Sequence, residues 1–287
     1  MNPRVVAGVL WHRIRDDYGG ADRFAEYAGL LRAVRDAGYE TMSVARFHER
    51  ASFGEPVGRW VALRHDVDIR DVAGNEAFFA AEREVGATST FYFRLSTAPP
   101  HRAFIARLLD AGFEVGYHFE EGATIAKRHR LDSREALLAR RPEIQDLFRR
   151  NCAAFRRQWN RDLVSVASHG DWVNRRLGTT NNELISAELL AECGLRFEAY
   201  GADVLGRADV YVSDVASPPE RWTGGYGLAD ALRDTRSPIY VLAHERRWHS
   251  ARGAAARADA DRLIDGLRYR LGRPDGAAPP GPAAHGE

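Results

Sequence analysis

The sequence predicts an α/β protein folded as a single deformed (β/α) barrel of about seven parallel strands. Apolar β runs alternate with helical segments along nearly the whole chain, and no linker divides it. With 287 residues, 45% of them hydrophobic, the chain can form one large core. We expect one domain over residues 1–272, with the active site at the C-terminal ends of the strands. Residues 273–287, rich in Pro, Gly and Ala, are expected to form a disordered tail.

The expected elements follow from hydrophobic periodicity and from the glycines that close the helices. The segment from residue 24 to 34, for example, has an apolar stripe at helical spacing and is followed by Gly38. Helices are expected at residues 22–37, 76–85, 101–110, 133–159 (interrupted at Pro142), 184–193 and 255–269. Strands are expected at residues 5–11, 41–44, 89–95, 113–120, 163–169, 197–199, 210–214 and 238–244, and at the start of 60–70.

Composition excludes several classes of function. The net charge is +1, with 41 basic and 40 acidic side chains, which indicates neither a nucleic-acid partner nor a membrane surface. Lys127 is the only lysine, so Schiff-base chemistry has little support. Cys152 and Cys193 are expected to be reduced structural thiols. No apolar run is long enough for a signal peptide or a membrane span, so we expect a cytoplasmic protein.

Residues 60–70 contain the most informative motif of the chain. An apolar strand ends there in Arg64, Asp66 and Asp68, which the two-residue period of a strand points to one side. Two carboxylates on one side repel, so a cation, a proton or a metal must lie between or beside them. The pair is therefore a candidate for a metal ligand with an adjacent general base. The alternative is an Arg64–Asp66 ion pair, with Asp68 capping a helix that begins near Asp71.

Other predicted strands also end in titratable side chains, and in a parallel barrel all these ends lie on one face. Any one of them could be a packing or loop residue, but five such ends are hard to explain by packing alone. One carboxylate and one or two imidazoles can hold a divalent cation, Asp66 can act as base, and His244 beside Asp214 can protonate a departing amine. This set describes hydrolysis of an amide or ester. The strand-end residues are Asp66, Asp68, His118, Glu120, His169, Asp214 and His244.

At these positions the chain resembles the polysaccharide deacetylase (NodB-like) superfamily, carbohydrate esterase family 4, and especially its divergent intracellular branch. The resemblance runs from residues 10–13 to residues 242–244. It implies Asp66 as base, Asp68 and His118 as metal ligands and His244 as general acid. The matching motifs are His65-Asp66-Val67-Asp68, Tyr117-His118-Phe119-Glu120, Ser168-His169-Gly170, Ser213-Asp214 and Leu242-Ala243-His244.

Two departures from the family pattern stand out. The usual second motif has another histidine four residues on, where this chain has Gly122, so either Glu120 or His169 must complete the metal shell. The usual arginine of the third motif is absent, and Arg64 is the candidate to hold the base carboxylate instead.

Three residues are candidates for substrate binding. Arg64 lies beside the base, while Trp172 and Trp222 follow strand ends and could stack on a sugar ring. For either tryptophan, packing within a loop is the alternative role.

The sequence thus predicts a metal-dependent hydrolase that removes an N-acetyl or similar N-acyl group. The expected metal is zinc, with cobalt, nickel, manganese and iron as alternatives. Expected substrates are an acetamido sugar, a sugar-nucleotide, a glycolipid precursor or a natural-product intermediate. Two other functions stay open: hydrolysis of another C–N bond, as in cyclic amides or ureides, and a catalytically inactive sugar-binding protein.

Overall fold

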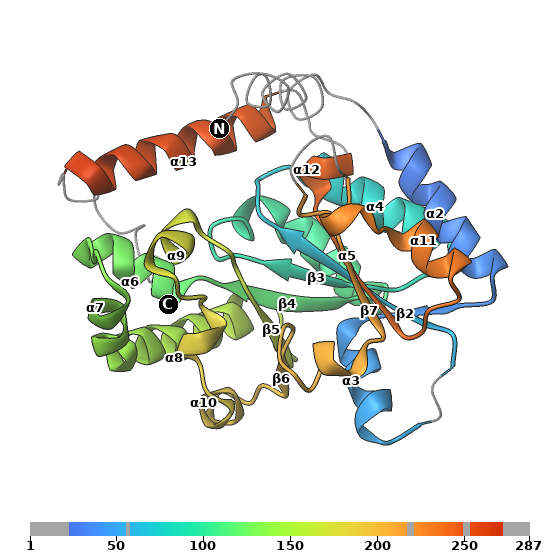
Figure 1. The fold of residues 1–287 in the computed structure, drawn as a ribbon, viewed down its shortest axis with the longest axis horizontal. Coiled ribbons are helices and arrows are strands. Elements are labelled where there is room, and N and C mark those ends of the chain that lie inside the picture. The colour runs from blue at the N-terminus through green and yellow to red at the C-terminus, as the bar shows by residue number, and fades with distance from the viewer. Residues whose placement is uncertain (1–22, 56–57, 217–220, 249–252, 272–287) are drawn as a thin grey trace, which may run out of the picture.

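Eight parallel strands form one sheet, curled into a half-barrel, in the computed structural model (Figure 1), which describes residues 23–55, 58–216, 221–248 and 253–271. The strand order is β6-β5-β4-β3-β2-β8-β7, and β1 pairs with the first part of β2. This confirms the predicted deformed parallel barrel. The strands are β1 (Glu40–Met42), β2 (Trp60–Val67), β3 (Thr90–Phe93), β4 (Glu114–Phe119), β5 (Ser165–Ser168), β6 (Phe197–Glu198), β7 (Val210–Ser213) and β8 (Ile239–Ala243).

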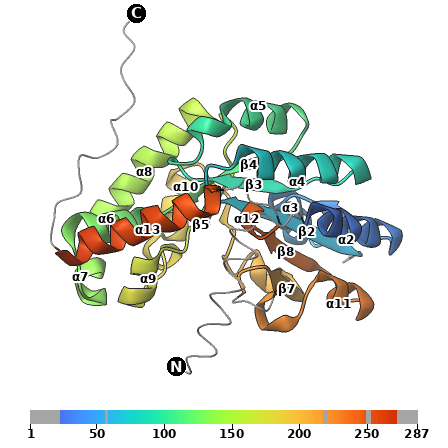
Figure 2. The ribbon, with the colours of Figure 1, turned by 90° about the horizontal axis from the view of Figure 1, so that it is seen from above.

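Helices connect the strands, and most of them pack against the convex side of the sheet (Figure 2). They are α2 (Phe24–Asp36), α3 (Val44–Ser52), α4 (Val72–Val85), α5 (Arg102–Asp110), α6 (Glu121–His129), α7 (Arg134–Ala139), α8 (Arg141–Gln158), α9 (Trp172–Leu177), α10 (Ala187–Glu192), α11 (Leu228–Arg233), α12 (Glu245–Trp248) and α13 (Ala254–Leu271). The strand expected at residues 5–11 and the tail expected at residues 273–287 lie outside the described residues.

Several predicted helix boundaries differ from the structure: α4 begins at Val72 instead of residue 76, and α10 covers Ala187–Glu192 instead of residues 184–193. The helix expected over residues 133–159 is two helices, α7 and α8, that meet at Arg140. Pro142 lies in the first turn of α8, where backbone N–H groups have no acceptor within the helix, so proline is tolerated there. The helix that follows β2 is capped by Asp71, whose side chain accepts from the Gly74 N–H, so Asp68 is free of the capping role considered for it.

Strand β2 is buried on both faces. Its side chains point alternately to the two faces, and this alternation decides which of them reach the site. Leu63 and Val67 pack in the large core beneath the helices, while Ala62 packs in the smaller core on the concave face. Because side chains alternate, Arg64 and Asp66 follow Ala62 on the concave face. The concave side of β2 therefore changes from apolar to charged toward its C-terminal end.

Helix α13 lies across the C-terminal ends of the central strands (Figures 1 and 2). Ala255 is its only buried residue, so polar contacts hold it in place. Asp265 lies 2.5 Å from Lys127 Nζ of α6, and the Tyr269 hydroxyl donates to the Leu131 carbonyl oxygen. None of the described helices is long and apolar enough to cross a membrane.

Candidate active site

The base candidate Asp66 is held by Arg64 through two parallel hydrogen bonds. Arg64 Nε donates to Oδ1 and Nη2 donates to Oδ2, both at 2.8 Å, and both side chains are buried. Burial alone would raise the pKa of Asp66, but the charge of Arg64 lowers it overall. The ring centroid of Tyr200 lies 4.1 Å from the guanidinium carbon of Arg64. Asp66 is therefore ionised and fixed in orientation.

Asp68, His118 and His169 come together from β2, β4 and β5. Asp68 Oδ1 lies 3.3 Å from His118 Nε2 and 3.4 Å from His169 Nε2, and the three ligand atoms lie within 4.8 Å of one another. His118 Nδ1 lies 2.9 Å from the Ala167 carbonyl oxygen, which fixes the N–H on Nδ1 and leaves a lone pair on Nε2. We call these three residues the triad.

The buried polar atoms of the triad fit a divalent cation. Asp68 Oδ1 and both ring nitrogens of His169 are buried and have ionisable neighbours at 3.3–3.4 Å but no well-aligned hydrogen bond, an arrangement that costs free energy unless a ligand compensates it. Burial, reinforced by Arg94, lowers the pKa of His169, so the imidazole is in its neutral, metal-binding form. One carboxylate and two imidazoles with open positions are a donor set typical of catalytic zinc. The triad could therefore hold a divalent metal.

Glu120, the alternative third ligand, lies on the outer side of His169. Its carboxylate is bound by Arg94, from Nε at 3.1 Å and from Nη2 at 2.6 Å. Its Oε2 lies 3.3 Å from His169 Nδ1, while the opposite ring nitrogen of His169 faces Asp68. Glu120 also belongs to a second group of possible ligands with His169 and Asp171. The triad thus pairs His169 with Asp68 and His118, and Glu120 is placed to orient the His169 ring.

Gly122, the position at which a second histidine was considered, is closely packed by two side chains. A Cβ there would lie 2.4 Å from Leu184 Cδ1 and 2.6 Å from Asn181 Oδ1. Asn181 uses that space to hold the site together: its Oδ1 accepts from the Ala123 N–H, and its Nδ2 donates to the His169 carbonyl oxygen at 2.6 Å. The segment that excludes a ligand at Gly122 therefore fixes the backbone of His169.

The acid candidate His244 forms a tight pair with Asp214. His244 Nδ1 lies 2.6 Å from Asp214 Oδ1, and the His244 N–H donates to Oδ2 at 2.7 Å. The indole N–H of Trp248 donates to the same Oδ2 at 3.1 Å. Burial would lower the pKa of His244, but the charge of Asp214 outweighs it and raises the pKa to about 9. His244 is therefore protonated at neutral pH.

Replacing Asp214 with asparagine is expected to move the alkaline limb of the activity profile to lower pH. Because the pKa of His244 is raised to about 9, the proton is present below that pH and is lost as the pH rises through it. A cation at Asp68 repels the imidazolium, so the wild-type limb should lie at or below pH 9. Without Asp214, burial still lowers the pKa of His244 and the carboxylate beside it no longer raises it, so the alkaline limb should fall by about 1–3 pH units.

The measurement is kcat against pH. The control is Asp209→Asn, which alters an exposed carboxylate paired with Arg236 and should leave the limb in place. An unchanged limb in Asp214→Asn would contradict the role given to His244.

The two candidate sugar-stacking tryptophans pack against other aromatic rings. Trp172 packs edge-on against Tyr269 at 5.1 Å between centroids, and its indole N–H donates to Asp265 of α13 at 3.4 Å. Trp222 packs against Trp248 at 5.6 Å. Neither lines the cavity at the triad, and their role toward a substrate stays a prediction. Arg64, the third candidate, is fully buried behind Asp66.

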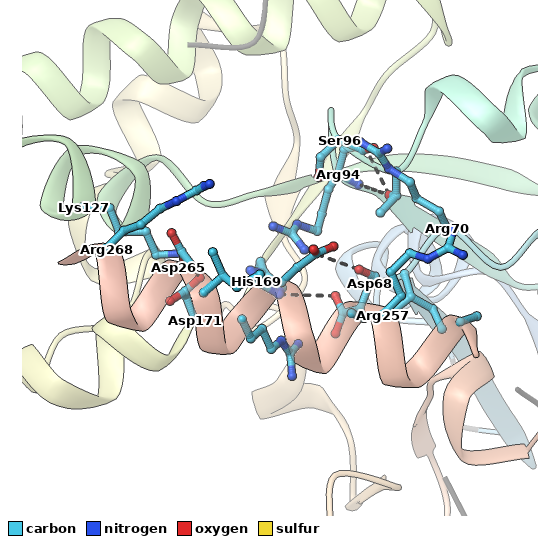
Figure 3. Close-up of a pocket in the computed structure, with 17 residues that line it drawn as sticks. Asp68, Arg70, Arg94, Ser96, Lys127, His169, Asp171, Arg257, Asp265 and Arg268 are labelled. Atoms are coloured by element: carbon cyan, nitrogen blue, oxygen red, sulfur yellow. Dashed lines mark hydrogen bonds and ion pairs between the residues drawn. The ribbon is translucent and has the colours of Figure 1, made fainter. Parts of the chain in front are cut away.

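A cavity of about 560 Å³ opens on two members of the triad (Figure 3). Its floor includes Asp68 and His169, and its opposite wall is one face of α13; we call it the α13 cavity. A second cavity of about 430 Å³, lined by residues 168–171, 174–175, 178–183 and Tyr200, shares His169 and Asp171 with it. Asp68 and His169 therefore face a cleft large enough for a small-molecule substrate.

Two residues that shape the site are absent from the set predicted from the sequence. Arg94 follows β3 directly, so the strand-end rule that found the acids and histidines would have found it too. Trp248 is the last residue of α12, and no periodicity or spacing indicates its contact with Asp214.

Comparison with solved structures shows a likeness to a CE4 family chain. That chain is a mutant described as a CE4 family pseudoenzyme with restored enzymatic activity, matched with a TM-score of 0.40 and 13% identity. The match covers 72% of this chain and 63% of that one, so this chain spans less than two thirds of its length. No protein-family profile and no curated protein matches the sequence.

Proposed function

We propose that the protein is a metal-dependent N-deacetylase. The observation that carries this proposal is the position of β2, whose base carboxylate lies between the triad on the β4 and β5 side and the His244–Asp214 pair on the β8 and β7 side. Asp66 Oδ2 lies 3.5 Å from His118 Nε2, and the neighbouring residues His65 and Ala243 are direct ladder partners. A base, a metal-binding set and an acid thus meet at one end of the sheet.

The chain's own residues can perform both proton transfers of amide hydrolysis. Asp66, ionised and held by Arg64, takes a proton from water as the water oxygen bonds to the acyl carbon. His244, kept protonated by Asp214, gives a proton to the amide nitrogen as the C–N bond breaks, which releases acetate and a free amine. A divalent cation at the triad would supply Lewis acidity toward the carbonyl oxygen and make water more acidic. Zinc suits the donor set best.

The proposed substrate is an acetamido sugar or a sugar-nucleotide, with a glycolipid precursor or a natural-product intermediate as further members of the class. The proposed location is the cytoplasm, where such small substrates occur.

The test is acetate release from N-acetylglucosamine and from UDP-N-acetylglucosamine by zinc-loaded protein. The variant His244→Ala should turn over about 10²- to 10⁴-fold more slowly, because the proton donor is lost. The matched control is His129→Ala, whose ring pairs with Glu143 away from the site and whose loss should change nothing. Ring opening of a cyclic amide without acetate release would favour the other C–N hydrolase. Tight sugar binding without turnover would favour a sugar-binding protein.

A further inference from the structure

The α13 cavity is lined by more basic than acidic side chains. Within the described part of the chain, two of the bases are neutralised: Lys127 by Asp171 and Asp265, and Arg94 by Glu120. Asp68 belongs to the triad. The lining comprises six basic residues and four aspartates: Arg70, Arg94, Lys127, Arg257, Arg262, Arg268, Asp68, Asp171, Asp261 and Asp265.

Four arginines of this lining have no carboxylate partner within 4.0 Å among the described residues. Arg257, Arg262 and Arg268 come from α13, and Arg70 comes from the loop after β2, where its Nε donates to the Ser96 carbonyl oxygen. Figure 3 shows Arg257 beside Asp68, and Arg268 beside Lys127 at the far end of the cavity. Asp171 and Asp265 together exceed the charge of Lys127 by one, and Asp68 and Asp261 also oppose the four arginines, so the described lining keeps a net positive charge of about one.

The spacing along α13 indicates an extended anion. Arg257 and Arg268 lie 11 residues apart, on one face of the helix, so about 16 Å of helix axis separates them. Planar guanidinium groups bind phosphate oxygens through paired N–H donors, and they retain their charge at any physiological pH. A single small anion cannot reach both ends of such a row, whereas a phosphorylated substituent lying along the helix can.

We infer that α13 forms a subsite for a phosphorylated arm of the substrate. This inference rests on the proposed deacetylase function and narrows its substrate to an acetamido compound that carries a phosphate or diphosphate group. The acyl group lies at the triad, and the phosphorylated arm lies along Arg257, Arg262 and Arg268. Asp68 and His169 line the same cavity as these arginines, so a single ligand of sufficient length can contact both groups.

Binding of pyrophosphate tests the subsite without any turnover. The experiment is isothermal calorimetry on the full-length Asp68→Ala variant. Because this substitution removes the triad carboxylate, anion binding by the arginine row can be measured without a contribution from the metal site. Pyrophosphate should bind this variant at one part of the row, and replacing Arg257, Arg262 and Arg268 together with glutamine should weaken binding at least tenfold wherever along the row it lies. The matched control is Arg270→Gln, an exposed arginine of α13 outside the cavity. No binding to Asp68→Ala, or equal weakening by Arg270→Gln, would overturn the subsite.

Kinetics of the zinc-loaded protein gives the second readout. Arg257→Gln should raise the KM for UDP-N-acetylglucosamine about tenfold and leave the KM for N-acetylglucosamine unchanged. For N-acetylneuraminate, which carries a carboxylate instead of a phosphate, the KM should rise less in Arg257→Gln. A larger rise in KM for N-acetylneuraminate than for the nucleotide sugar would overturn the preference for phosphate. Intact pyrophosphate binding without any acetate release would support the subsite and contradict the proposed function. Acetate release with a KM that does not change in the arginine variants would support the proposed function and contradict the subsite.

Discussion

Replacing Asp66 with asparagine is expected to lower kcat about 10²- to 10⁴-fold, because the amide cannot take a proton from water. Among the described residues, Asp66 is the only carboxylate that pairs with the buried guanidinium of Arg64, and the same change removes it. An unpaired buried charge costs about 3–5 kcal/mol of folding free energy. Loss of activity in this variant therefore combines a chemical cause with a structural one, and the two must be separated.

The double variant Arg64→Gln with Asp66→Asn separates them. It leaves neither charge in the core, so its free energy of unfolding, measured by urea titration, should recover much of what the single variant loses. Its kcat should stay as low as that of Asp66→Asn, because the base is still absent. Recovery of activity together with stability would mean that Asp66 is a structural partner of Arg64 and not the base.

Replacing Asp68 with alanine is expected to reduce the metal content from about one divalent ion per chain to none. Asp68 is the only carboxylate of the triad, and two imidazoles alone leave the cation weakly bound and its charge uncompensated. Elemental analysis of wild type and variant, purified identically, gives the result without depending on any substrate.

The matched comparison for this prediction is Asp171→Ala. Asp171 belongs to the second group of possible ligands, with Glu120 and His169, and also pairs with Lys127. If the triad is the metal site, Asp171→Ala should retain the ion. If Asp171→Ala loses the ion and Asp68→Ala retains it, the second group is the metal site. Absence of metal in the wild-type protein would contradict both sites.

The sequence is most informative where a strand's own alternation decides the outcome. Arg64 and Asp66 share a face of β2 because they lie two residues apart, and the ends of parallel strands meet at one edge of the sheet. Those two rules alone are enough to predict that Asp68, His118 and His169 lie close together. They cannot rank Glu120 against His169 as the third ligand, because both stand at strand ends on the same edge of the sheet. The side chain of Arg94, which occupies Glu120, is what distinguishes them.

Features that depend on how distant segments fold back are out of reach of the sequence. The periodicity of α13 predicts a helix, but its contacts with Lys127 and Leu131 are more than 130 residues away along the chain. Its burial is slight, so no strong apolar stripe indicates which surface it covers. By sequence alone, the arginines that it places over the triad are indistinguishable from ordinary solvent-exposed charges.

The packing at Gly122 links a residue without a side chain to the position of His169. Any side chain at that position would push against Leu184 and Asn181, and Asn181 is the residue that tethers the backbone of His169. A substitution at Gly122 is therefore expected to be felt at the triad through Asn181. The metal-binding set of this chain depends in this way on a residue that offers no ligand atom itself.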